Sequence, residues 1–246
     1  MLRTFRADLH IHSCLSPCGD EGMRPRAVVH RALATGLDMI AVCDHNSAEN
    51  VTSFMSAGSE RGLAVLPGME ITSKEEIHLL ALFDRSEDCM ALQEFIYHHL
   101  PGENEEEVFG RQTIINEKDE AIGTNRRMLI GATLLPLEQI VTMVGSFGGV
   151  VIASHIDRQA FSLLGQLGFI PEGLALDGLE ISPRTSREEA QERFHAYRRF
   201  SFVRFSDAHF LEDIGTNITH FLLEKTSSEE VKMALHHQRG RRVIEQ

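Results

Sequence analysis

Short apolar runs alternate along the chain with amphipathic stretches of helical period. The runs that predict strands are 5–9, 39–43, 64–71, 79–83, 150–153, 178–181, 201–205 and 220–223. The stretches between them carry helix signals: Pro25 begins one helix, Gly36 ends it, and Ser47 is expected to cap the next. This alternation predicts an α/β fold with a mostly parallel sheet covered by helices, either open or closed as a barrel.

One region interrupts this rhythm. Residues 86–133 begin with a helix-like piece over 86–100 and continue as polar, acidic sequence without strong periodicity. No internal repeat or low-complexity tract divides the rest of the chain. We therefore expect a single domain over 1–246, with the segment at about 86–133 inserted beside it.

Most of the predicted strands stop on a histidine or a carboxylate. In parallel α/β folds the carboxyl ends of the strands meet at one edge, where functional groups collect. The polar residues at or just after these ends are His10, His12, Asp44, His45, Glu70, His155, Asp157, Arg158, Glu180, Arg184, Asp207 and His209. His10 and His12 share one face of their strand, opposite the apolar set of Ala7, Leu9 and Ile11. His78 opens a strand, so this rule does not place it.

Imidazoles combined with carboxylates favour borderline divalent ions such as zinc, manganese or iron. The number of candidate ligands exceeds the four that fill a tetrahedral zinc site. We therefore expect two or three divalent ions.

The amino-acid composition indicates which partners and which cellular environment such a protein is expected to have. The 36 acidic and 24 basic residues give a formal net charge of −12, which repels a long duplex unless positive charge is locally concentrated. The start of the chain, MLRTFRADLH, lacks the apolar core of a secretory signal, and no run is long enough to span a membrane. Four cysteines do not form a disulfide framework, so we expect a reduced, cytoplasmic protein that does not bind membranes. The pattern carries no signal for an oligomeric state.

Six separate motifs, DLHIHS, DHN, GMEIT, HLLAL, SHIDR and SDAHF, occur in this order between Asp8 and Phe210. Together they resemble the PHP (polymerase and histidinol phosphatase) family. The resemblance implies a distorted seven-stranded β/α barrel with a trinuclear metal site at its mouth. Matched by motif, the ligands are His10, His12 and Asp207 for a first ion, His78 and His155 for a second, His45 and His209 for a third, and Glu70 as the carboxylate bridging the first two.

The chain departs from the family's small phosphatases in the loop after His12. Those proteins have an aspartate ligand for the third ion where this chain has Pro17. We expect Asp20 to supply the carboxylate from a longer loop, with the Cys18 thiolate as the alternative. A third ion that is loosely held or absent is a further alternative.

The resulting hypothesis is a metal-dependent phosphoesterase that hydrolyses a small phosphorylated metabolite or nucleotide through a metal-activated hydroxide. Glu70 holds the ions in this scheme, and Asp44 orients a ligand histidine. Arg158 and Arg184 have guanidinium geometry suited to phosphate oxygens, more so for Arg158; the alternative for each is a surface ion pair with a neighbour such as Asp157 or Glu188. We expect a small phosphorylated substrate and no binding of long nucleic acid.

Three alternatives remain. A short-oligonucleotide exonuclease would need basic residues at the barrel mouth, for which Arg126, Arg127 and Arg158 are the candidates. A metal-stabilised interaction domain without catalysis would tend to lose ligands, whereas this set is complete. Metal-dependent amidohydrolases also begin with His-x-His, but many bridge their ions with a modified lysine, and no lysine ends a predicted strand here.

Overall fold

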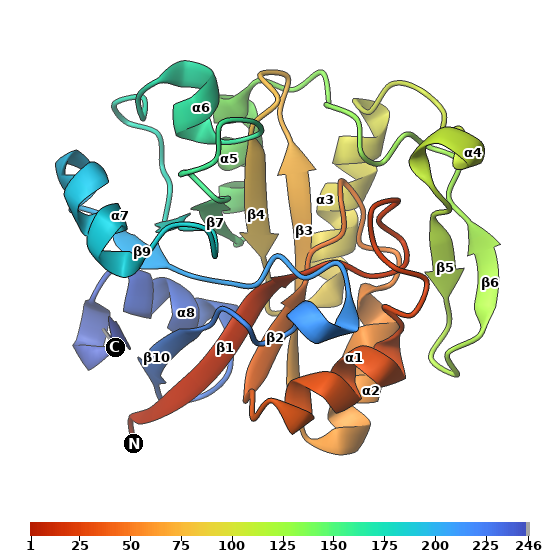
Figure 1. The fold of residues 1–246 in the computed structure, drawn as a ribbon, viewed down its shortest axis with the longest axis horizontal. Helices are drawn as coiled ribbons and strands as arrows, with labels where there is room; N and C mark the ends of the chain where they lie inside the picture. The colour runs from red at the N-terminus through yellow and green to blue at the C-terminus, as the bar shows by residue number, and fades with distance from the viewer. Residues whose placement is uncertain (245–246) are drawn as a thin grey trace.

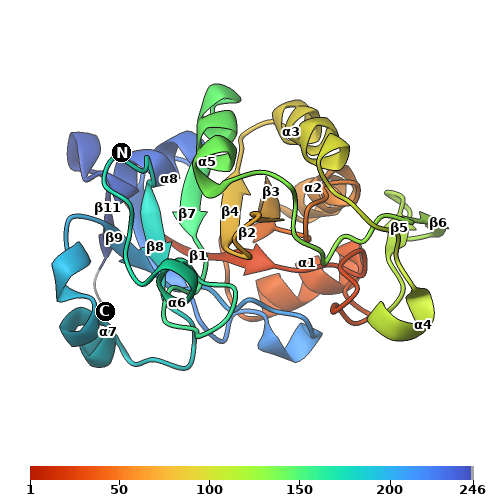
Figure 2. The same ribbon diagram turned by 90° about the horizontal axis from the view of Figure 1, so that it is seen from above.

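The computed structural model describes residues 1–244, and its centre is a sheet that curls into a nearly closed barrel (Figures 1 and 2). The sheet has nine strands in the order β11-β10-β1-β2-β3-β4-β7-β8-β9. Their bounds are β1 (Arg3–Ile11), β2 (Met39–Val42), β3 (Ala64–Thr72), β4 (His78–Leu82), β7 (Val150–Ala153), β8 (Gly178–Glu180), β9 (Ser201–Val203), β10 (Thr219–Leu223) and β11 (Arg242–Ile244). The distorted barrel is confirmed, with nine strands in place of seven.

Strand direction departs from the mostly parallel sheet that the sequence predicts. The pairs β1–β2, β2–β3, β7–β8 and β8–β9 are parallel, but β4 is antiparallel to both β3 and β7. The connection from β3 to β4 holds only residues 73–77, and a parallel crossover needs a dozen or more. At the other edge, β10 is antiparallel to β1, and β11 is antiparallel to β10.

Helices cover the outer surface of the sheet (Figure 2). Their bounds are α1 (Pro25–Ala34), α2 (Val51–Arg61), α3 (Ser86–His98), α4 (Glu106–Phe109), α5 (Leu137–Ser146), α6 (Leu163–Leu167), α7 (Arg187–Arg193) and α8 (Ser228–Leu235). Pro25 is the first residue of α1, and Gly36 adopts a φ of 75° just beyond its end, as the sequence predicts. Ser47 does not cap α2, because the helix begins only at Val51, with Asn50 at its N-cap position; the Ser47 hydroxyl is instead hydrogen bonded to the Tyr97 hydroxyl at 2.6 Å.

The segment that interrupts the sequence rhythm contains α3, α4 and the small hairpin of β5 (Thr113–Ile115) and β6 (Ala121–Thr124). The hairpin stands at one side of the barrel (Figure 1). The amide of Thr113 donates to the carbonyl of Cys14, which ties β5 to the loop that follows β1. Treating this segment as an insertion into one domain stays a prediction.

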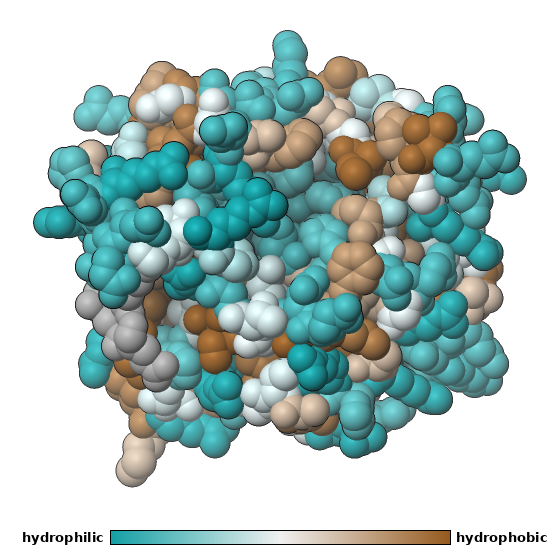
Figure 3. All heavy atoms as spheres, viewed as in Figure 1, coloured by the Kyte–Doolittle hydropathy of each residue, from teal (hydrophilic) through white to brown (hydrophobic). Residues whose placement is uncertain are grey.

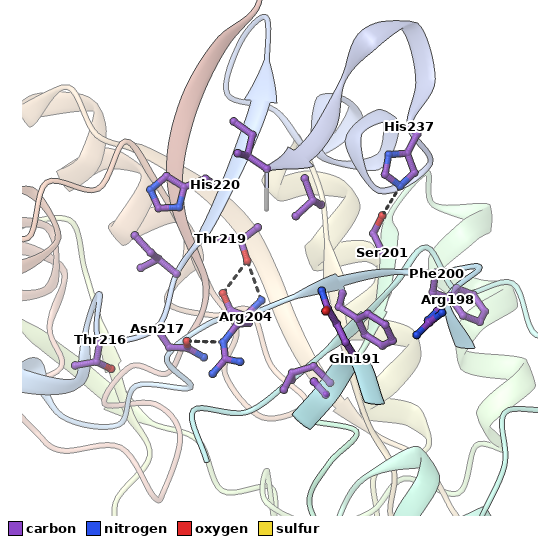
Figure 4. Close-up of a pocket in the computed structure, with 16 residues that line it drawn as sticks. Gln191, Arg198, Phe200, Ser201, Arg204, Thr216, Asn217, Thr219, His220 and His237 are labelled. Atoms are coloured by element: carbon purple, nitrogen blue, oxygen red, sulfur yellow. Dashed lines mark hydrogen bonds between the residues drawn. The ribbon is translucent and has the colours of Figure 1, made fainter. Parts of the chain in front are cut away.

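The barrel has a seam between its edge strands, since no ladder joins β9 to β10 or β11 in the described part of the chain. A cavity of about 730 Å³ lies along this seam (Figure 4). Thr219 closes one side of it, because its hydroxyl is within 2.8 Å of both the amide and the carbonyl of Arg204. The residues that line the cavity include none of the candidate metal ligands. Among residues 1–244, no helix combines the length and the apolar character that crossing a bilayer requires.

Candidate metal centre

A β-bulge in β1 decides where the two histidines of DLHIHS point. Asp8 pairs with Ile40 and Ile11 with Val42, so β1 carries one more residue than β2 between these pairs. Before the bulge, Leu9 packs in the barrel interior, whereas Ile11 after it packs against the outer helices. His10 and His12 are therefore buried at the interior end of the barrel, on the same side as Leu9 and not opposite to it.

The reversed strand β4 brings His78 to the same rim. His78 pairs with Thr72 at the end of β3, and Leu79 pairs with Ala153 at the end of β7. The first residue of an antiparallel strand thus lies beside the last residues of its neighbours. His155 lies two residues beyond the end of β7. This topology explains why a histidine that opens a strand joins others that close strands.

Glu70 lies at the centre of the cluster. Its carboxylate oxygens are 3.1–3.5 Å from ring nitrogens of five buried histidines. These are His10 (3.3 Å), His12 (3.5 Å), His45 (3.2 Å), His78 (3.1 Å) and His155 (3.4 Å). One oxygen of Asp207 lies 3.2 Å from Nε2 of both His10 and His12. The carboxylate of Glu70 is therefore positioned to be shared by more than one cation.

The hydrogen bonds of His10 and His12 indicate which ring nitrogen carries a proton. Nδ1 of His10 lies 3.0 Å from Glu180, a carboxylate that only accepts, so this nitrogen is the donor. Nδ1 of His12 lies 3.0 Å from the Ser16 hydroxyl, which itself donates to Asp44. In the neutral rings both Nε2 atoms are then bare lone pairs, facing each other at 3.3 Å and facing the carboxylates. Lone pairs that face one another at such distances require a positive charge between them, which a proton or a metal ion supplies.

Other buried polar atoms of the cluster also lack a partner, which a metal ion could supply. Nδ1 of His45, Nδ1 of His78 and Oε1 of Glu70 are buried without a hydrogen-bond partner. A buried polar atom left unpaired costs free energy, so such atoms are rare unless an ion satisfies them. His10, His12 and Glu70 form one group with ligand atoms within 4.8 Å of one another, and His45, Glu70 and His78 form another. The residues therefore fit divalent ions.

A third group joins His12, His45 and His209 to Cys18, again with ligand atoms within 4.8 Å of one another. Asp20, the expected carboxylate, is exposed, and its side chain accepts from the amide of Gly22 in a tight turn. The structure therefore does not bring Asp20 into this group, and the expectation for it is corrected: its carboxylate is engaged by the turn. The loop brings Cys18 to that position instead.

Charges within the cluster act strongly on one another. Burial raises the pKa of Glu70, but the neighbouring His78 and His10 outweigh it and hold the pKa well below its usual value. Burial lowers the pKa of His10, but Glu180, Asp207 and Glu70 outweigh it and raise the pKa well above its usual value. The field around His10 therefore favours a positive charge. Burial, reinforced by His12, lowers the pKa of His209 to about 4, which keeps its imidazole neutral as a ligand must be.

Two carboxylates outside the cluster orient its histidines. Asp44 accepts from the amide and hydroxyl of Ser13 and from the hydroxyl of Ser16. Its effect on His12 is therefore indirect and passes through Ser16. Glu180 acts directly, since it bonds Nδ1 of His10 and accepts from the amide of His155. In the sequence, Glu180 ends a predicted strand but has no assigned role. The signal for a role at the site is that it belongs to the same series of strand-end residues as the candidate ligands.

The two candidate phosphate-binding arginines lie in different places. Nη2 of Arg158 donates to Asp207 at 2.6 Å, while Nε is buried and has no hydrogen-bond partner. Arg184 is exposed, and with Thr185 and Arg193 it lines a separate hollow that contains none of the ligands. The structure thus brings Arg158 to the cluster and does not bring Arg184 there.

The backbone around the cluster is strained. Asn46, His155 and Asp207 have φ values of 51°, 27° and 52°, a region that costs non-glycine residues about 1–3 kcal/mol. Each is a candidate ligand or adjoins one. Such strain persists where surrounding contacts enforce it, and it is concentrated at functional sites.

A cation-binding rim at the end of a nearly closed α/β barrel defines the class of metal-dependent hydrolases that act on phosphoric esters. A family model described as the PHP domain matches residues 8–198. The chain belongs to the PHP domain family, which confirms the resemblance carried by the six motifs.

Individual relatives add detail. Over 91 residues the chain is 35% identical to a 5'-3' exoribonuclease of Haemophilus influenzae, a match that covers 35% of this chain and 32% of that protein. The chain thus matches about a third of that relative's length. Among solved structures, the lesion-specific endonuclease PfuEndoQ of Pyrococcus furiosus has a TM-score of 0.74 at 17% identity, covering 98% of this chain and 58% of that one. Endonuclease Q in complex with a 27-mer duplex gives a TM-score of 0.73 at 16% identity, with the same coverage.

These relatives contradict the expectation of a small phosphorylated substrate without long nucleic acid. The names of the relatives are those of nucleases, and one structure holds a DNA duplex with an abasic lesion. The net charge of −12 describes the whole surface, but binding depends on the local field at the mouth. The overall charge therefore does not exclude a nucleic acid as substrate.

Proposed function

We propose that this chain is a metal-dependent nuclease that removes nucleotides from the 5' end of RNA. The arrangement around Glu70 carries the proposal, because five histidines and Asp207 supply ligands for several ions. When bound, divalent ions supply a hydroxide nucleophile near neutral pH and neutralise the charge of a phosphodiester. The exoribonuclease name of the relative at 35% identity favours RNA as the substrate.

We assign the ions to three groups of residues. His10, His12 and Asp207 would hold one ion and His78 and His155 a second, with the Glu70 carboxylate close enough to both sets to be shared. Cys18, His45 and His209, which lie beside His12, would hold the third, where a thiolate favours zinc or iron over manganese. Glu180 and Asp44 keep the imidazoles of the first ion in the tautomer that leaves Nε2 free.

The residues around the rim have separate tasks with the substrate. Arg158 lies between Asp207 and solvent and can exchange its ion pair for a phosphate oxygen, to which Nε also donates. The exposed Arg126 and Arg127 belong to the segment that Asn46 holds against the rim, since the Asn46 amide donates to the carbonyls of Leu129 and Gly131. These arginines supply local positive charge along the path of a strand.

The test uses an RNA oligonucleotide labelled at its 3' end, with manganese, zinc or chelator. Stepwise shortening of the labelled strand from the 5' end is the expected result, with none in chelator. Arg158→Ala should raise KM more than it lowers kcat, and Arg184→Ala is the matched control. Hydrolysis of p-nitrophenyl phosphate without cleavage of RNA would refute the nuclease and keep the phosphoesterase.

A further inference from the structure

Phe161 is an exposed aromatic residue held rigidly at the edge of the metal centre. Its side chain is among the exposed large apolar ones, with 45% of the residue accessible. Its ring stacks on the His78 imidazole, with centroids 4.9 Å apart and planes 25° apart. Figure 3 shows a hydrophilic hollow on the face of the molecule that Figure 1 presents, with apolar side chains on parts of its rim.

The backbone fixes this position. Phe161 has a φ of 57°, a region that bulky residues rarely adopt. Its carbonyl accepts from the amide of His78 at 3.0 Å, and the next residue, Ser162, is buried and caps α6. The Ser162 hydroxyl also donates to the carbonyl of Arg158 at 2.6 Å. One short loop thus holds an arginine beside Asp207 and an aromatic ring on His78.

We infer that Phe161 is the platform on which the nucleobase of the reacting nucleotide stacks, which makes it a specificity-determining residue. One face of the ring covers His78, while the exposed part of the ring is open to a planar ligand. A base lies one sugar away from its phosphate, so a phosphate at the ions and Arg158 leaves the base at the rim. Stacking on an aromatic ring is the usual sequence-tolerant way to hold single-stranded nucleic acid.

This inference rests on the proposed function and can be tested separately from it. A purely structural Phe161 would shield His78, and its loss would weaken every phosphorylated ligand equally. A stacking Phe161 distinguishes ligands with a base from ligands without one. Adenosine 5'-monophosphate and ribose 5-phosphate form such a pair, and their binding to the metal-loaded protein can be measured by calorimetry without turnover of RNA.

Phe161→Ala should weaken binding of adenosine 5'-monophosphate by about 5- to 150-fold, the range for loss of one stacked base. Binding of ribose 5-phosphate should not change. Phe161→Tyr should retain the preference for the base, and Phe161→Leu should lose most of it. Phe169→Ala is the matched control, because Phe169 is also exposed but makes no ring contact with a ligand histidine in the described chain.

Equal weakening of both ligands by Phe161→Ala would overturn the inference. A wild-type protein that binds both ligands equally would also overturn it. RNA cleavage is read in a separate assay. Cleavage that continues without base preference refutes only the stacking role, whereas base-dependent binding without cleavage refutes only the exonuclease.

Discussion

Two neighbouring regions each bury a carboxylate, but they differ in the number of hydrogen bonds that the carboxylate accepts. Glu70 in the metal centre and Asp44 in the loop beside it are each 1% exposed. Asp44 receives three hydrogen bonds from Ser13 and Ser16. Oε1 of Glu70 receives none and instead faces imidazole nitrogens.

The difference separates two uses of a buried carboxylate. A carboxylate whose lone pairs are filled by amides and hydroxyls holds a loop in place, as Asp157 does with Ser182 and Thr185. A carboxylate with an unfilled lone pair, surrounded by ring nitrogens of several histidines, is positioned to hold cations. Burial alone therefore does not identify a ligand, but burial combined with missing donors does.

The largest expected effect comes from Glu70→Gln. The change removes the charge shared by the ions, so bound metal should fall and hydrolysis should drop by at least about 10²–10³-fold. Metal analysis and kcat on RNA measure the two effects together. Glu60→Gln, at an exposed glutamate of α2, is the control. Full activity in Glu70→Gln would contradict the central role of this carboxylate.

Cys18→Ser tests the third group. Cobalt bound to a thiolate gives a near-ultraviolet charge-transfer absorption, which should be present in the wild type and absent from the variant, with one ion fewer per chain. Cys89→Ala is the control, since Cys89 is a buried residue of α3 whose thiol donates to the carbonyl of Gly68 in β3 at 3.5 Å. An unchanged absorption in Cys18→Ser would mean that no thiolate ligates there.

Asp44→Asn should affect both the fold and the metal. It places an amide donor among groups that already donate, so the free energy of unfolding of the metal-free protein should fall by about 1–3 kcal/mol. Through Ser16 and His12, metal affinity should fall by about 10–100-fold. Denaturant titration and metal titration measure these effects. A variant that keeps both its stability and its metal affinity would show that Asp44 supports neither the loop nor the metal centre.

The smallest effect is expected at Glu230, a buried carboxylate remote from the cluster. Burial raises its pKa, but Arg241 and the amide of Glu224 outweigh it and lower the pKa below 4.5. A lowered folded pKa contributes stability that is complete above about pH 4.5 and is lost as the pH falls through the folded value. Glu230→Gln should therefore cost about 1 kcal/mol at pH 7 and less under acid, with metal content unchanged. A penalty that is constant with pH would refute this.

The order of strands along the chain and most of the candidate cluster could be predicted from the sequence. Hydrophobic periodicity and the residues at strand ends are local properties that the sequence shows directly. The bulge in β1 could not be predicted, since it depends on the register with β2. Which of Cys18 and Asp20 lies near His45 and His209 depends on the conformation of the loop, in which the Asp20 carboxylate accepts from the Gly22 amide. The role of Glu180 follows from its distance of 3.0 Å to Nδ1 of His10, which cannot be read from the spacing of residues in the sequence.

The reversed strand β4 also has a consequence for how the protein folds. Because β3 and β4 form a hairpin, Glu70 and His78 become neighbours through a contact that is close in sequence. Hairpins form in about 1–10 μs, whereas pairings between distant parallel strands form more slowly. We therefore expect the β3–β4 hairpin to form early and to bring Glu70 and His78 together. The strands that follow it in the sequence would then pack against this preformed part of the site.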